Sequence, residues 1–201
     1  MRTHLDWLSI VRLGLVQTAL GSVVLLATSV MNRLMVVELA LPAVLPGALY
    51  ALHYAMRLSR PRVGHGSDQG GRHTPWMLGG MAVLALGGIG AAFSVSVMTT
   101  HLWAGIGMAM VAYVLIGLGV GAAGTTLLVL LGKRVAPARR PAAATIVWMM
   151  MILGFIVTGA GVGQVLDPFS TGRLLLVCTV VCGLAPLLAT TAVWGIEARL
   201  A

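Results

Sequence analysis

The chain has 201 residues, of which 59% are hydrophobic and only 9% are charged, and its formal net charge is +8. Soluble globular domains contain about half apolar residues, so this composition excludes an ordinary soluble domain. The apolar residues form repeated runs that are long enough to cross a bilayer, which takes roughly 20 residues per helix. We therefore expect an integral membrane protein that forms one transmembrane domain over residues 1–201.

The apolar runs predict an all-α fold with six transmembrane helices. Residues 1–12 mix charge with Trp7 and are expected to form an amphipathic segment at the membrane interface. The second span contains Pro42 and Pro46, which should kink it or leave it locally open. The six predicted spans are residues 13–31, 35–56, 76–99, 102–131, 142–165 and 174–196.

Small and polar residues within the spans predict contacts between helices. Gln17 is a lone polar residue in the first span, and we expect it to hydrogen-bond to a neighbouring helix. Glycines in the fourth and fifth spans should let other backbones approach closely. These glycines are Gly117, Gly121, Gly159, Gly161 and Gly163.

The basic residues predict the orientation of the chain. Eleven of the thirteen fall near the termini, in the connection 57–75 or in the basic loop 132–141, whereas Arg33 and Arg173 fall in the alternate connections. The positive-inside rule places the side richer in basic residues in the cytoplasm. Both termini should then be cytoplasmic. The positive charge is thus explained by topology and by contact with the lipid bilayer, and we expect no nucleic-acid partner.

The chain shows no arrangement of residues typical of an enzyme active site. It contains no Ser/His/Asp set, no phosphate-binding loop followed by Lys and no carboxylate pair. Cys178 and Cys182 lie four residues apart in the sixth span without further thiol or imidazole ligands nearby, so packing is the expected role of both.

The connection 57–75 contains an unusual polar motif, "GHGSDQGGRH". Its glycines allow a tight turn, and a carboxylate there can pair with a nearby guanidinium or a helix N-terminus. The spacing resembles the G-x-x-x-D-x-x-G-R-[RK] loop of the major facilitator superfamily. That resemblance implies half of a major-facilitator bundle, in which this loop acts as a conformational latch; the alternative is a solvated polar turn. The latch residues are Gly64, Asp68, Gly71 and Arg72.

A second motif, "NRLMVVEL", occurs in residues 25–49. Together with the following Pro42 and Ala43, and with the loop at Gly64–Asp68, it resembles the PucC/LhaA family. The resemblance implies the N-terminal six-helix half of a protein that assists assembly of light-harvesting complexes and delivers or shields bacteriochlorophyll. Its partners would be antenna polypeptides or a reaction-centre complex, and a second six-helix half or a second copy of the chain. The rival readings are a major-facilitator transporter of a small solute, working as a paired half, and a structural subunit of a photosynthetic complex.

Four residues are candidates for the site that this resemblance implies. Asn32, Arg33 and Glu38 belong to the matched motif, and the two charged residues can either pair across the turn or contact a ligand. His53 lies in the second span, and a neutral imidazole is a suitable axial ligand for the magnesium of a chlorin. The alternative for His53 is a hydrogen-bonded interfacial residue beside Tyr50 and Tyr54. No metal ion is expected to bind the protein directly.

Overall fold

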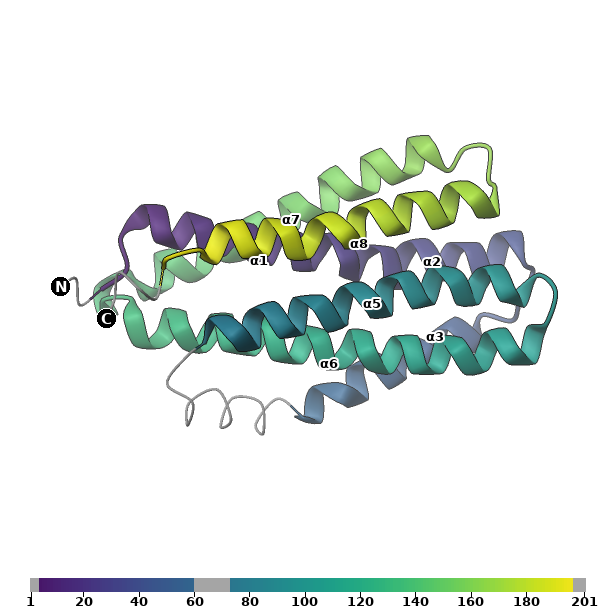
Figure 1. The fold of residues 1–201 in the computed structure, drawn as a ribbon, viewed down its shortest axis with the longest axis horizontal. Helices are drawn as coiled ribbons and strands as arrows, with labels where there is room; N and C mark the ends of the chain where they lie inside the picture. The colour runs from purple at the N-terminus through teal and green to yellow at the C-terminus, as the bar shows by residue number, and fades with distance from the viewer. Residues whose placement is uncertain (1–3, 60–72, 197–201) are drawn as a thin grey trace.

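The computed structural model describes residues 4–59 and 73–196, and every regular element in these two ranges is a helix (Figure 1). The predicted all-α membrane architecture is confirmed, because five helices are long and apolar enough to cross a membrane. The predicted number of six is not confirmed. The helix α3 has 12 residues as described, and a span takes roughly 20. The five long helices are Trp7–Glu38, Thr74–Met98, Leu102–Arg134, Pro137–Val165 and Thr171–Val193.

The first helix continues past the point where the sequence predicted a connection. It runs without interruption from Trp7 to Glu38, so the predicted end of the first span at residue 31 and start of the second at 35 were wrong. The chain leaves the helix only at residues 39–43, where Ala40 has a φ of 50° and Pro42 disfavours helix in the residue before it. The predicted opening at a proline is thus confirmed. Within this helix, α1 (Trp7–Leu25) and α2 (Met31–Arg33) are α-helical, and η1 (Leu26–Val30) and η2 (Leu34–Glu38) are π-helical.

The N-terminal part of the chain is the start of this same helix. Asp6 caps α1, since its carboxylate accepts a hydrogen bond from the Ser9 N–H at 3.0 Å. Residues 7–12, which were expected to form an interfacial segment, are therefore the first turns of α1. Arg12 extends from these turns to the end of α8 (Thr171–Val193) and donates to the carbonyl oxygen of Trp194 at 2.6 Å.

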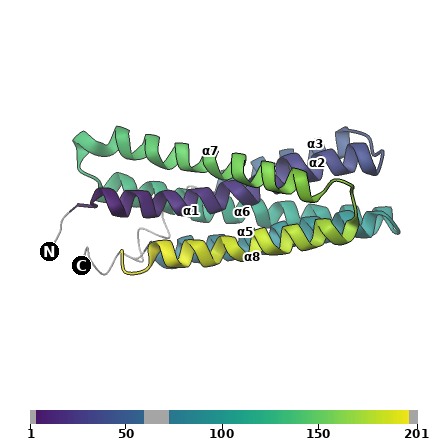
Figure 2. The same ribbon diagram turned by 90° about the horizontal axis from the view of Figure 1, so that it is seen from above.

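Both ends of the described chain lie at the same end of the bundle (Figures 1 and 2). The backbone N–H of Leu5 donates to the carbonyl oxygen of Arg134 at 2.8 Å, so the N-terminal segment contacts the end of α6 (Leu102–Arg134). The guanidinium of Arg139 lies 5.4 Å from the centre of the Trp7 ring. Arg12, Arg134 and Arg139 therefore lie at one end of the bundle, and the predicted cytoplasmic location of this end stays a prediction.

The helices pack in the spatial order α7, α1, α8, α5, α6, α3. The helices α5 (Thr74–Met98) and α6 form an antiparallel hairpin, and α8 packs against both α5 and α1 (Figure 1). Two helices are peripheral: α7 (Arg140–Val165) contacts mainly α1, and α3 (Val44–Ala55) contacts mainly α6. The short 3₁₀ turns η3 (Met56–Ser59) and η4 (Pro137–Arg139) follow α3 and precede α7.

Glycines set the distance between several of these helices. A Cβ added to Gly119 of α6 would lie 2.5 Å from the Leu84 backbone nitrogen of α5, so only glycine allows this approach. Gly117 allows the same close approach between α6 and the end of α3, which confirms the predicted role of this glycine in helix packing. The prediction was wrong for Gly161 and Gly163, because neither has any atom within 4 Å of an added Cβ.

Candidate functional site

The residues of the PucC-like motif lie on the last turns of the first helix. Asn32, Arg33 and Glu38 are all exposed, and no ion pair joins Arg33 to Glu38 in the part of the chain that the structure describes. A helix of 32 residues is about 48 Å long, which exceeds the roughly 30 Å hydrocarbon core of a bilayer. The two charged residues can therefore reach the polar layer of the membrane without neutralising each other.

The motif coincides with an irregularity of the backbone. The π-helical turns η1 and η2 flank Met31–Arg33 on both sides. The chain then closes the break through a hydrogen bond from the Leu41 N–H to the Met35 carbonyl oxygen, at 2.9 Å. Such π turns are rare and are found frequently at functional sites, which makes this stretch the first candidate region.

His53 is buried between α3 and α6, with 1% of its surface exposed. Its ring lies nearly parallel to the Tyr50 ring, with 6.0 Å between the ring centres, and nearly perpendicular to the Tyr54 ring, with 5.2 Å between the ring centres. A Cβ on Gly117 would lie 2.7 Å from the His53 carbonyl oxygen, so α6 presses directly on this turn of α3. A macrocycle could reach the imidazole only if α3 moved away from α6.

The latch residues predicted from the polar motif are Gly64, Asp68, Gly71 and Arg72. All four lie outside the described residues, as does most of the loop 57–75. The latch therefore stays a prediction.

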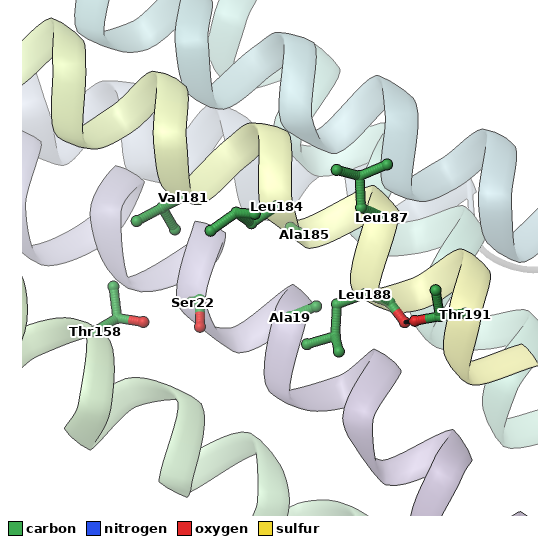
Figure 3. A pocket seen from close by; sticks show the side chains of 9 residues that line it. All are labelled: Ala19, Ser22, Thr158, Val181, Leu184, Ala185, Leu187, Leu188 and Thr191. Atoms are coloured by element: carbon green, nitrogen blue, oxygen red, sulfur yellow. Dashed lines mark hydrogen bonds between the residues drawn. The ribbon is translucent and has the colours of Figure 1, made fainter.

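A groove on the side of the bundle forms the second candidate region (Figure 3). The helices α7 and α8 both pack on α1 but make few contacts with each other, which leaves a space of about 490 Å³ between them. Its floor is formed by Ala19 and Ser22 of α1, and its walls by Thr158 of α7 and by α8 leucines such as Leu184 and Leu188 (Figure 3).

The groove presents an almost entirely apolar surface. The Ser22 hydroxyl donates to the Thr18 carbonyl oxygen at 3.1 Å, and the Thr191 hydroxyl donates to the Leu188 carbonyl oxygen at 3.0 Å. Both of these hydroxyls are used within their own helices, so the Thr158 hydroxyl is the one polar side-chain group of the lining that forms no hydrogen bond among the described residues. The shape and chemistry suit a hydrocarbon chain, and across the described ranges no group of three or more His, Cys, Asp or Glu residues can hold a metal ion.

Polar residues of α1 hold α7 in place beside this groove. The Thr18 hydroxyl donates to the Met150 carbonyl oxygen at 2.8 Å, and Gln17 donates to the Met151 sulfur at 3.4 Å. The prediction that Gln17 bonds to a neighbouring helix is thus confirmed. The roles of Thr18 and Ser22 were missed, although the spacing of Gly14, Thr18 and Ser22 every four residues is a signal of close helix contact.

Comparison with known sequences identifies relatives of this chain. The sequence model of the family described as "PUCC protein" matches residues 30–201. The chain is 55% identical, over 98% of its length, to a Rhodobacter capsulatus protein named "Bacteriochlorophyll synthase 44.5 kDa chain". It is 28% and 27% identical, over 94% of its length, to proteins named "Protein PucC" from Cereibacter sphaeroides and Rhodovulum sulfidophilum.

The chain spans less than half of these relatives, namely 46% of the first and 44% of the other two. No solved structure matches it significantly.

Proposed function

This chain belongs to the PUCC protein family, and from that premise we propose that it binds bacteriochlorophyll in the membrane and assists the assembly of light-harvesting complexes. One observation carries the proposal: nearly the whole chain aligns, at 55% identity, with a protein named as a bacteriochlorophyll synthase chain. The word synthase belongs to the name of that relative and is not carried over to this chain. The fold favours binding over catalysis, because its two candidate regions are a helix irregularity and an apolar groove.

The groove between α7 and α8 supports the handling of a pigment with a hydrocarbon tail. It opens on the side of the bundle (Figure 3), where a chain dissolved in the bilayer can enter without crossing a polar surface. Burying apolar atoms of a tail against Val181, Leu184 and Leu187 adds packing contacts that lipid chains also offer. The groove therefore positions a tail, and specificity must come from the pigment ring.

The proposed orientation and partners follow from the charge pattern and the family. Both termini are placed in the cytoplasm, on the inner or photosynthetic intracytoplasmic membrane, because eleven of thirteen basic residues fall on that side. In this proposal the chain contacts antenna polypeptides or a reaction-centre complex. It pairs with a second half of a major-facilitator bundle or with another copy of itself, and the loop with Asp68 and Arg72 acts as the latch.

The test is an absorbance spectrum of the chain purified in mild detergent from a host that makes bacteriochlorophyll. We expect a near-infrared chlorin band that elutes with the protein in gel filtration. His53→Ala tests the predicted magnesium ligand, and His101→Ala, at an exposed position in the α5–α6 turn, is the matched control. A band that weakens only in His53→Ala identifies His53 as the ligand.

A colourless preparation with the elution volume of a folded protein would contradict pigment binding. The assembly role is tested separately by deleting the gene in a phototrophic host. We expect reduced levels of light-harvesting complexes, and unchanged levels would refute the assembly role.

A further inference from the structure

A cavity of about 380 Å³ lies beside the π-helical stretch of the first helix. It is enclosed by η1 and α2 on one side, by the start of α3 on another and by α6 behind. Hydroxyl and amide groups reach it from Thr28, Ser29 and Asn32 of the first helix, from Tyr50 of α3 and from Tyr113 of α6. Its chemistry is therefore unlike that of the apolar groove.

The irregular backbone accounts for this space. A π turn holds an extra residue and interrupts the regular packing surface of a helix, and the break at residues 39–43 starts α3 as a separate helix. Gly47 of α3 lines the cavity, and no atom lies within 4 Å of a Cβ added there. The space beside Gly47 is therefore unfilled, and Tyr113 lines the same cavity from α6.

The polar groups of the cavity differ in what they can still bind. The Thr28 hydroxyl donates to the Val24 carbonyl oxygen at 2.8 Å, and the Tyr113 hydroxyl donates to the Ala27 carbonyl oxygen at 2.5 Å. The side chains of Ser29 and Asn32 form no hydrogen bond with any residue of the described ranges. Both side chains line this cavity and both are exposed.

The chemistry of the lining defines the ligand class. No charged side chain lines the cavity, so a charged ligand would lose its hydration without gaining a counter-charge. The Asn32 amide and the Ser29 hydroxyl are donors that suit a carbonyl oxygen, and Tyr50 and Tyr113 offer aromatic surface beside them. We propose that this cavity binds the carbonyl-bearing edge of a neutral amphipathic ligand, with Asn32 and Ser29 as its hydrogen-bond donors.

Two membrane molecules offer this carbonyl chemistry. A bacteriochlorophyll ring carries ketone and ester carbonyls, and its assignment as the ligand rests on the proposed function. A neutral glycerolipid carries ester carbonyls and does not depend on that function. The two sources can be distinguished because each can be added to the purified protein by itself.

The experiment compares substitutions of three cavity-lining residues of the first helix in the full 201-residue chain. Asn32→Leu and Ser29→Ala remove the available donors at exposed positions, where the fold does not depend on the side chain. Thr28→Val is the matched control, because the Thr28 hydroxyl already donates within its own helix. The probes are bacteriochlorophyll a and dioleoylglycerol in detergent micelles, and affinity is measured by equilibrium titration.

We expect Asn32→Leu to bind bacteriochlorophyll a about tenfold more weakly, which corresponds to about 1.4 kcal/mol, the scale of one hydrogen bond. Ser29→Ala should bind more weakly as well, and Thr28→Val should bind like the wild type. If only the affinity for dioleoylglycerol falls, the carbonyl site stands and its ligand is a lipid. If neither affinity changes in Asn32→Leu and Ser29→Ala, the inference is overturned.

These outcomes separate the cavity from the proposed function. A wild-type chain that binds no bacteriochlorophyll contradicts the proposed function, while the dioleoylglycerol titration still tests the cavity. If the wild type and both donor variants bind the pigment with the same affinity, the proposed function stands and the pigment site in this cavity is refuted.

Discussion

The attachment of α7 to the bundle depends on Gly154. This helix contacts mainly α1, and a Cβ added to Gly154 would collide with the carbonyl oxygen of Thr18. The same contact includes the hydrogen bond from the Thr18 hydroxyl to the Met150 carbonyl oxygen, at 2.8 Å. Gly154→Ala must therefore push α7 away from α1. A shift of roughly half an ångström already takes this bond beyond the usual limit of about 3.2 Å.

The expected cost follows from three contributions. Overpacking of a close contact costs about 1–3 kcal/mol, and the loss of one interhelical hydrogen bond in a membrane costs about 0.6 kcal/mol. Alanine is favoured over glycine within a helix by about 1 kcal/mol. Gly161 lies on the same helix with open space around it, so only the preference for alanine over glycine applies to Gly161→Ala. The two variants should therefore differ by about 1.6–3.6 kcal/mol in the free energy of unfolding.

Thermal unfolding with a thiol-reactive dye measures this difference, because Cys178 and Cys182 are buried in the folded chain. For a chain of this size, about 1 kcal/mol shifts the melting temperature by roughly 2–4 °C, so Gly154→Ala should melt roughly 3–14 °C below Gly161→Ala. Trypsin cleavage after Arg139, directly before α7 begins, reports detachment of α7 by itself. Equal melting temperatures together with equal cleavage rates would refute this account of the α1–α7 contact.

Three further predictions concern buried groups. Tyr113→Phe removes the hydrogen bond to the Ala27 carbonyl oxygen and should lower the free energy of unfolding by about 1 kcal/mol; an unchanged melting temperature would contradict it. Gln17→Leu removes a hydrogen bond to the Met151 sulfur, which is a weak acceptor, and also removes a buried Oε1 atom that has no hydrogen-bond partner among the described residues. Stability should therefore stay unchanged or rise, and a loss of several degrees would argue against this. Cys178 and Cys182, each with 0% exposure, should react with maleimide only after denaturation in SDS, and rapid labelling in mild detergent would show that α8 is packed differently.

Hydropathy predicted the later helices well and the first two poorly. The predicted span 102–131 compares with Leu102–Arg134, and 142–165 with Arg140–Val165. At the ends of these helices the apolar run and the helical backbone stop at nearly the same residue. In the first helix they do not, because Arg33 interrupts the apolar run while the helical backbone continues.

The physical reason is that a charge near the membrane surface costs little, whereas a proline acts on the backbone directly. An exposed Arg33 can extend to the polar layer, so the helix hydrogen bonds continue past it to Glu38. Pro42 lacks an N–H and restricts the residue before it. The proline was therefore the better indicator of the helix end, and it lies within the break.

The candidate site was predictable only where it depends on contiguous sequence. The motif with Asn32 and Glu38 could be identified from the residues alone, and its position on irregular helix could not. The cavity needs Tyr113, which is 81 residues from Asn32 in the sequence, and nothing local to Tyr113 indicates its hydrogen bond to Ala27. Burial of His53 likewise depends on a glycine of another helix.

Both candidate regions adjoin a peripheral helix. The groove lies beside α7, which is held mainly by α1, and the cavity lies beside α3, which is held mainly by α6. Each of these two helices is held mainly by one neighbour, whereas α1, α5, α6 and α8 form the packed set of the bundle. A ligand could reach His53, which is 1% exposed, only after α3 separates from α6 at Gly117.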